Sequence, residues 1–451
     1  MKQTEKTVNQ ITEGIIWKQL LYFFFPILLG TFFQQLYNTA DAMVVGRFVG
    51  KEALACVGGS SSQIINLIVG FFVGLSSGAT VIIAQYYGAR DERNLQDTLH
   101  TAIAFSIVGS FVISILGIVL SPIILRLMNT PEYLMADSLL YLRFYFGGII
   151  FIFIYNIGSG ILRAVGDSKN PLYFLIFSCS LNLLLDLLAV TVFSFGVAGI
   201  AGATVLAQLI SSVLCFLYLY RNFRFLIPSR RHFSYNKKLV SELVTTGFSM
   251  GLMNSIFSIG SVILQGSINT LGTSIIAAHT AARRIVMIGN MPLASIASAN
   301  ATFVSQNFGA GRMDRIRDGI RKSSILCLIW SAMFLVMILT LAEPLVKALA
   351  GTDDPVIMSN ALMNLHINMI FFFPLGVLLT LRMTLQGINY KTIPLISSSM
   401  ELVIKILASF VFVPLWGYAG ASVAEPFSWL LCMLFLLFSY IRIMKKEKIY
   451  S

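Results

Sequence analysis

The chain has 451 residues, of which 57% are hydrophobic and only 12% are charged, and its formal net charge is +12. Soluble domains carry about twice that share of charged residues, so the composition excludes an ordinary soluble protein. The apolar runs are continuous and do not alternate with polar residues, which excludes a membrane β-barrel. The sequence therefore predicts an all-α polytopic membrane protein.

Apolar runs long enough to cross a bilayer, which takes about 20 residues, recur along the whole chain. In chain order the twelve predicted spans are residues 16–45, 53–77, 98–122, 133–161, 171–192, 197–220, 240–270, 274–300, 321–343, 356–385, 392–414 and 418–441. The first run is too long for the apolar core of a cleavable signal peptide, and Pro26 predicts a kink in it. Short connections at 194–196 and 415–417 predict helical hairpins.

The basic residues of the loops lie almost entirely on one side of this layout. The connection after the sixth span alone holds Arg221, Arg224, Arg230, Arg231, Lys237 and Lys238, whereas the opposite connections together hold only Arg47, Lys51, Arg126 and Lys347. The positive-inside rule then predicts a multi-pass protein of the plasma (inner) membrane with both termini in the cytoplasm. It explains the net charge without a nucleic-acid partner. The five cysteines follow no metal or redox spacing, and we expect no cofactor.

The second half of the chain repeats the first at a nearly constant offset of about 222 residues. QYYGA at 85–89 returns as QNFGA at 306–310, FGVAG at 195–199 as WGYAG at 416–420, and the loop 162–171 as the loop 385–394. The repeat predicts two six-helix lobes, 1–225 and 239–451, joined by a basic cytoplasmic linker at 226–238. An even number of spans per copy relates the lobes by a pseudo-twofold axis along the membrane normal, as in transporters that rock two lobes about a central site.

Polar residues inside the first-lobe spans are the candidate functional site. Asn182 and Asp186 are four residues apart and share one helix face, and Asp41 and Thr204 are predicted at the same depth. A carboxylate in hydrocarbon is unfavourable by at least roughly 2.5–3.5 kcal/mol, so such residues usually mark ion or proton sites. Two mechanisms stay open: oxygen ligands suit a cation such as Na⁺, and two close carboxylates that cannot readily both ionise suit a proton. The alternative is a structural hydrogen-bond network that includes Arg143.

The second lobe does not copy this set and carries charges of both signs instead. The candidate network there is Arg284, Arg382, Glu401 and Lys405, beside Arg283, and Glu401 and Lys405 form an i,i+4 pair. We interpret it as a buried ion-pair network that is either structural or coupled to gating. Candidate residues for a substrate cavity are Gln34, Tyr37, Asn38, Arg143, Asn156, His279, Asn364 and His366. Gln34, Tyr37 and Asn38 share a helix face with Asp41.

These motifs together resemble the multidrug and toxic compound extrusion (MATE) family. The resemblance rests on the segments 34–47, 85–89 and 162–171 and on Asn182 and Asp186, and it covers nearly the whole chain. It implies a two-lobed, twelve-helix fold and the export of amphiphilic, often cationic compounds in exchange for Na⁺ or H⁺. It also implies a first-lobe cation site at Asp41, Asn182, Asp186 and Thr204. One branch of the family has a second acidic site, but the corresponding spans here offer Gln265 and Asn364 or Asn368.

We therefore expect a secondary efflux transporter, a monomer in the bilayer, that exchanges Na⁺ or H⁺ for small organic compounds. A dedicated exporter of one endogenous metabolite and a flippase of lipid-linked precursors fit the same residues. A channel is a different class of protein, and it predicts flux driven by a gradient without counterflow of a second compound. An enzyme is not expected, because no nucleotide-binding loop, metal triad or nucleophile elbow occurs in the sequence.

Overall fold

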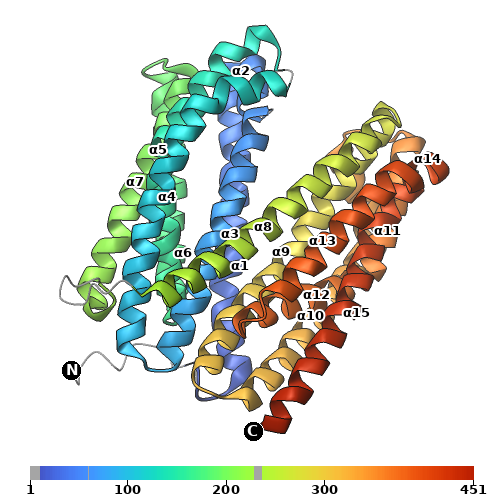
Figure 1. Cartoon of the computed structure of the whole chain (residues 1–451). Helices are drawn as coiled ribbons and strands as arrows, with labels where there is room; N and C mark the ends of the chain where they lie inside the picture. Colours follow the sequence, from blue (N-terminus) through green and yellow to red (C-terminus); the bar gives the residue numbers. More distant parts are fainter. Residues whose placement is uncertain (1–10, 59, 129, 228–235, 451) are drawn as a thin grey trace. The chain divides into compact units, whose positions relative to one another are not determined.

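The computed structural model describes residues 11–58, 60–128, 130–227 and 236–450, and in these residues the regular elements are all helices (Figure 1). Ten of the helices are long and apolar enough to cross a membrane. The pair α11 (Pro355–Ile370) and α12 (Phe372–Gly387), with a bend of 52° between them, together has the length and composition of a broken span or a re-entrant loop. The predicted fold class, an all-α polytopic membrane protein, is confirmed.

The helices of the first half of the chain follow the predicted spans closely. They are α1 (Ile16–Val44) with the π-helical turn Val45–Val49, α2 (Lys51–Gly58), α3 (Ser60–Gly88), α4 (Glu92–Leu127), α5 (Glu132–Ala164), α6 (Lys169–Thr191) and α7 (Gly196–Asn222). Several extend beyond their apolar runs, because a helix continues through polar residues until a cap or breaker ends it. Asp91, for example, begins α4 by accepting a hydrogen bond from the backbone N–H of Asn94.

The helices of the second half repeat this order. They are α8 (Lys237–Asn269), α9 (Thr273–Gly309), α10 (Met313–Ala350), α11, α12, α13 (Thr392–Leu407) with the π-helical turn Ala408–Phe412, α14 (Val413–Trp416) and α15 (Tyr418–Tyr450). The helix α9 corresponds to the predicted eighth span, but its many Ala, Ser and Asn residues make it less apolar than the others. About half of its residues are buried, so they do not have to face lipid.

The structure differs from the prediction in the tenth span, which is not one straight helix. The chain leaves the helical path at Phe371, between α11 and α12. Pro374 lies four residues after Ile370, where its ring excludes the regular hydrogen bond to the carbonyl of that residue, and this explains the break. The predicted hairpin turns do form: Ser194, Gly196 and Gly417 have positive φ angles of 54°, 57° and 58°.

The described residues fall into two compact units: Pro26–Gly251, and Ile11–Phe25 with Leu252–Ser451. Both α1 and α8, the first helix of each repeat, therefore begin in one unit and continue in the other. The predicted lobe bounds of 1–225 and 239–451 remain a prediction. Most of the predicted linker, residues 228–235, lies outside the described residues.

Within the first unit, glycines bring α3 and the beginning of α8 into backbone contact. A Cβ atom added at Gly74 would lie 2.6 Å from the carbonyl oxygen of Met250, and one added at Gly78 would lie 2.5 Å from Cα of Gly247. Gly74 and Gly78, like Gly247 and Gly251, are four residues apart and form one strip on each helix. Small residues at this spacing allow membrane helices to pack closely, which explains why the start of α8 belongs to the first unit.

Within the second unit, Arg315 of α10 holds the segment Ile11–Phe25. Its guanidinium group donates hydrogen bonds to the carbonyl oxygens of Ile11, Glu13 and Gly14 at 3.2, 3.3 and 2.9 Å, and to Oε1 of Gln19 at 3.0 Å. Asn307 of α9 accepts from Arg315 Nε at 3.0 Å and donates to the carbonyl of Ile11. Because one buried side chain serves several carbonyls, the position of this segment depends on Arg315.

Replacement of Arg315 by alanine is expected to release this segment. It leaves several acceptors without their donor, which we expect to destabilise the local structure by about 1–3 kcal/mol. Hydrogen–deuterium exchange of the detergent-solubilised protein should then be faster for the amides of Ile11–Phe25. Arg312→Ala is the matched control, because the ion pair of Arg312 among the described residues is an exposed one with Asp314. Equal exchange in both variants would contradict the anchoring role.

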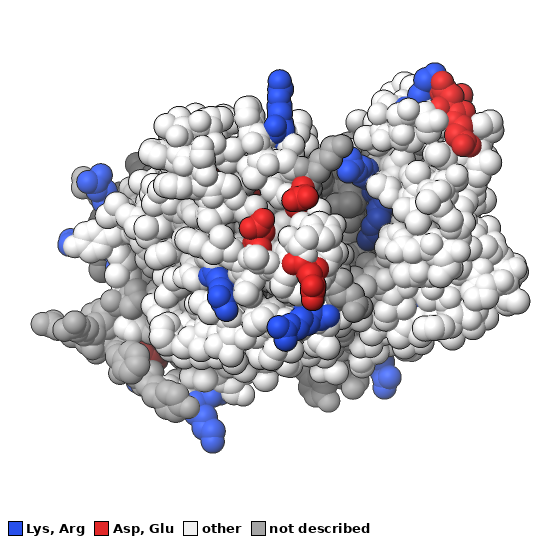
Figure 2. Space-filling model, turned by 90° about the horizontal axis from the view of Figure 1, so that it is seen from above, with Lys and Arg blue, Asp and Glu red and all other residues white. Residues whose placement is uncertain are grey.

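The surface of the helices is strongly apolar. Large side chains such as Phe111, Val119, Ile288 and Val336 are more than half exposed. On the face drawn in Figure 2, Lys, Arg, Asp and Glu form small separate groups within a surface that consists mostly of other residues. A surface of this kind is unfavourable in water and suits contact with lipid chains.

Candidate functional site

The four predicted cation-site residues of the first half lie together in the first unit. Asp41 comes from α1, Asn182 and Asp186 from successive turns of α6, and Thr204 from α7. The side-chain amide of Asn182 satisfies its neighbours when its nitrogen faces acceptors and its oxygen faces a donor. In this orientation Asn182 donates to Asp186 Oδ2 at 3.3 Å and accepts from the Thr204 backbone N–H at 3.0 Å. The i,i+4 spacing thus places two polar groups of α6 on one face, toward α1 and α7.

The two carboxyl groups of this cluster, those of Asp41 and Asp186, are close enough to interact electrostatically. Asp186 is completely buried, and in the part of the chain that the structure describes no donor reaches the buried Oδ1 atoms of Asp41 and Asp186. Neither aspartate forms an ion pair with Lys, Arg or His in the described part of the chain. Two carboxylates this close repel each other strongly in a low dielectric, so the arrangement favours a cation or a proton between them.

Tyr37 completes the cluster on the α1 side. Asn182 donates to its hydroxyl oxygen at 2.8 Å, and Tyr37 is one turn before Asp41 on the same face of α1. The donors are therefore oxygens of carboxylate, amide, hydroxyl and phenol groups. Hard cations such as Na⁺ prefer oxygen ligands, so the residues present fit a small monovalent cation.

The other predicted cavity residues do not join this cluster. Gln34, Asn38, Arg143 and His366 are exposed, and the side chain of Asn156 donates to the carbonyl of Ile152 within its own helix. Arg143 forms no ion pair among the described residues, so the alternative network with Asp41 and Asp186 has no ion pair to support it. His279 and Asn364 lie in the second unit, where they line a different small cavity.

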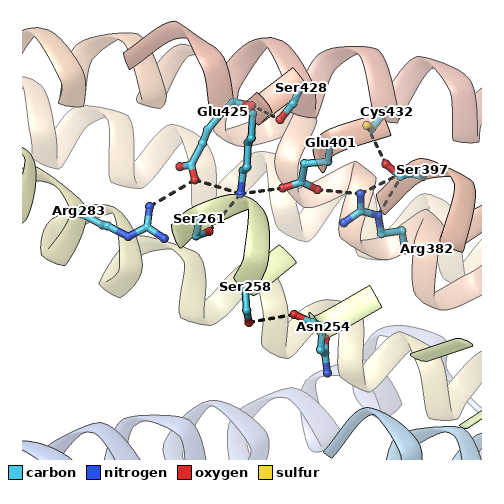
Figure 3. Close-up of polar contacts among 11 residues, drawn as sticks. Asn254, Ser258, Ser261, Arg283, Arg382, Ser397, Glu401, Glu425, Ser428 and Cys432 are labelled. Carbon is cyan, nitrogen blue, oxygen red and sulfur yellow. Dashed lines mark hydrogen bonds and ion pairs between the residues drawn. The ribbon is translucent and has the colours of Figure 1, made fainter. Parts of the chain in front are cut away.

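The charged residues of the second half form one connected network, shown in Figure 3. Arg382 Nη2 pairs with Glu401 Oε2 at 2.9 Å, and Lys405 Nζ lies 3.5 Å from Glu401 Oε1 and 3.3 Å from Glu425 Oε1. The predicted residues Arg382, Glu401 and Lys405 are thus brought together. Lys405 is almost completely buried, so each of its carboxylate partners is required to hold its charge.

The network contains a different arginine of α9 from the one that the sequence predicts. Arg283 pairs with Glu425 at 3.3 Å, whereas Arg284 is exposed and forms no ion pair in the described residues. Adjacent residues of a helix point about 100° apart, and the sequence could not show which of the two faces α15. Ser397 and Ser261, which bind Arg382 and Lys405, were also not predicted, because serine is common in helices of all kinds.

Long apolar helices enclosing buried charged clusters define a polytopic membrane transporter. The sequence model of the MatE family matches the chain twice, over residues 26–188 and 249–411, two segments of equal length. The chain belongs to the MatE family. It is accordingly a transporter and not an enzyme.

Curated relatives of this family come from several bacteria. The chain is 30% identical to the probable multidrug resistance protein YoeA of Bacillus subtilis over 68% of this chain and 67% of the relative. It is 24% identical to the probable multidrug resistance protein NorM of Thermotoga maritima over 90% and 88%. A relative from Shewanella oneidensis that is 23% identical over 76% of each chain is named an FAD transporter.

Solved structures show the same fold. An outward-facing multidrug resistance MATE transporter of the MOP superfamily matches with a TM-score of 0.91 and 24% identity, covering 99% of this chain and 100% of its own. A MOP superfamily transporter from Pyrococcus furiosus matches with a TM-score of 0.90 and 23% identity, covering 98% and 99%. The MATE fold is thus shown for the whole chain.

Proposed function

We propose that the chain is a cation-coupled antiporter that exports amphiphilic organic compounds in exchange for Na⁺ or H⁺. The coupling ion binds at Asp41, Asn182, Asp186 and Thr204. The protein works as a monomer in the plasma membrane, with both termini in the cytoplasm. The relatives named as multidrug resistance proteins support efflux, and the distribution of basic loop residues supports the orientation.

One observation carries the proposal: the neighbouring carboxyl groups of Asp41 and Asp186 each have a buried oxygen without a hydrogen-bond donor among the described residues. Without a bound cation or proton, their repulsion favours a separation of α1 and α6 at this point. A bound cation removes the repulsion and stabilises the two helices together. An ion gradient can therefore bias the conformation of the first unit, which is what coupled transport requires.

The experiment is efflux of ethidium, a fluorescent organic cation, from proteoliposomes under a Na⁺ gradient or a pH gradient imposed separately. We expect one gradient to drive transport in the wild type. Asp186→Asn keeps the size of the side chain but removes its charge, so gradient-driven transport should be lost. Glu132→Gln is the matched control, because Glu132 is exposed at the beginning of α5.

The result under the two gradients identifies the coupling ion. Transport that continues in Asp186→Asn at the wild-type rate would falsify the proposed site. Dissipation of the ion gradient without counterflow of ethidium would indicate a channel. A thermal melt of each purified variant establishes that loss of transport does not reflect unfolding.

A second candidate function is export of one endogenous metabolite, and the relative named an FAD transporter favours it. The same coupling site would serve it, because an ion gradient can drive export whatever compound is exchanged. The two candidates differ in breadth. Transport of a single compound class, with no ethidium efflux in the folded wild type, would favour the metabolite exporter.

A further inference from the structure

The ion pairs of the second unit form a chain in which cations and carboxylates alternate. The order is Arg283, Glu425, Lys405, Glu401 and Arg382, contributed by α9, α15 and α13 and ending on α12 (Figure 3). Both ends of the chain are arginines. Three cations therefore face two carboxylates, so the chain carries one net positive charge although each cation has a carboxylate neighbour.

An uncompensated positive charge inside a membrane protein needs a functional or structural reason. A charge in the hydrocarbon region is unfavourable unless it is paired or reaches water. Lys405 lies between two carboxylates and is only 1% exposed, so its charge is compensated from both sides. The surplus must lie at one of the two arginines.

The two ends of the chain are not equivalent. The Arg382 side chain is 8% exposed and binds both Glu401 and Ser397, with its Nη2 and Nε donating to the Ser397 hydroxyl at 3.1 and 3.2 Å. The Arg283 side chain is 32% exposed, and its ion pair among the described residues is with one oxygen of Glu425, which Lys405 also contacts. The positive charge of Arg283 is therefore less fully compensated than that of Arg382.

Arg283 borders a small polar cavity of about 20 Å³ inside the second unit. Its polar lining consists of His279, Arg283, Asn364, Asn368, Ser422 and Glu425. The volume suffices for one water-sized group, since about 10–15 Å³ is the minimum. Asn368 is 3% exposed, and its Oδ1 is buried without a hydrogen-bond donor. The cavity is thus lined by the Arg283 guanidinium with its partner Glu425, and by Asn368, whose Oδ1 has no donor among the described residues.

We propose that Arg283 binds an anionic group, a phosphate or a carboxylate, of the exported compound. The guanidinium of arginine offers five N–H donors in a planar fork that suits these groups. A hydroxyl next to the anionic group would donate to Asn368 Oδ1. Such a site extends the proposed export function from cations to amphiphiles that carry a negative charge. The inference rests on the proposed function only in assuming that the bound compound is exported.

Two flavins that differ by one phosphate test the proposal. Riboflavin and riboflavin 5′-phosphate are both fluorescent, so binding to the purified protein in phosphatidylcholine nanodiscs can be followed by anisotropy without any ion gradient. We expect the phosphorylated flavin to bind about tenfold or more tightly than riboflavin, the range that one hydrogen bond to a charged group provides. Arg283→Gln should abolish this preference.

Arg284→Gln is the matched control, because the neighbouring arginine is exposed and unpaired in the described residues. It should keep the preference for the phosphorylated flavin. Arg283→Lys keeps the charge but not the planar fork, so it should keep part of the preference for the phosphorylated flavin. This remaining preference would also show that a variant at this position is folded. An equal affinity for both flavins in the wild type, or a preference that Arg283→Gln leaves intact, would overturn the proposal.

A lipid phosphate is the other source of the same chemistry, and the nanodisc composition separates the two. Phosphatidylglycerol should leave the preference intact if Arg283 serves the exported compound. Suppression of the preference by phosphatidylglycerol would assign the anion site to lipid and overturn the role in export. Because these measurements use no gradient, their outcome is independent of whether ethidium antiport at Asp186 is observed.

Discussion

Replacement of Glu401 by glutamine is expected to destabilise the folded protein by about 3–5 kcal/mol, as removal of one partner from a buried ion pair usually does. Glu401 is the central carboxylate of the second-unit network and contacts both Arg382 and Lys405. Without the charge of Glu401, Arg382, which is 8% exposed, has no carboxylate partner among the described residues. Lys405, which is 1% exposed, keeps only Glu425, which also pairs with Arg283. Their desolvation is then no longer compensated.

The measurement is a thermal melt in detergent followed with a thiol-reactive dye. Cys56, Cys215, Cys327 and Cys432 are buried and free, so dye reaction reports unfolding. Asp353→Asn is the control, because the Lys347–Asp353 pair is exposed on both sides and should change stability by less than about 1 kcal/mol. Similar melting temperatures for Glu401→Gln and Asp353→Asn would contradict the structural role of the network.

A double variant separates charge from packing. Glu401→Gln combined with Arg382→Gln removes one charge of each sign and should recover part of the lost stability. An interaction energy close to zero in this double-mutant cycle would show that the two residues act independently.

Replacement of Gly78 by leucine is expected to force α3 and the start of α8 apart. The new Cβ would lie 2.5 Å from Cα and 2.6 Å from the backbone nitrogen of Gly247, and backbone atoms cannot rotate away as a side chain can. Insertion into a packed contact of this kind destabilises by about 1–3 kcal/mol, or more where the backbone must move. We expect a lower melting temperature and reduced transport.

Gly266→Leu is the control for this change, because nothing lies within 4 Å of a Cβ at that position of α8. Gly78→Ala should give a smaller effect in the same direction, since its Cβ alone makes the close contact. If Gly78→Leu melts at the wild-type temperature while Gly266→Leu melts lower, the close contact between α3 and α8 is contradicted.

The spans and the fold class could be predicted because they depend on local composition. Every predicted span corresponds to a helix or a helix pair. The predicted and observed helices differ where a helix-breaking residue interrupts a span, as Pro374 does after Phe371. The pairs at four-residue spacing, Asn182 with Asp186 and Glu401 with Lys405, also follow from the sequence. Helical geometry alone places such residues on one face.

Contacts between helices could be predicted only where a resemblance supplied them or where opposite charges occur in neighbouring spans, as for Arg382 and Glu401. Asp41 and Thr204 were joined to Asp186 by predicted depth and by the family resemblance, and the structure shows the same cluster. Nothing comparable existed for the pairing of Glu425 with Arg283 and Lys405, or for the segment held by Arg315. These contacts join residues more than a hundred positions apart except for Lys405 and Glu425, and no local pattern encodes them.

The sequence by itself determined the membrane class, the order of the helices, the internal repeat and the acidic face of α6, because each depends on residues close together in the chain. Tertiary structure alone decided that Arg283 and not Arg284 enters the network, and that the less compensated charge lies at the exposed end. The rotation of each helix about its axis is set by packing against its neighbours. A rotation of about 100° exchanges one residue for the next, and the sequence of one helix does not contain that information.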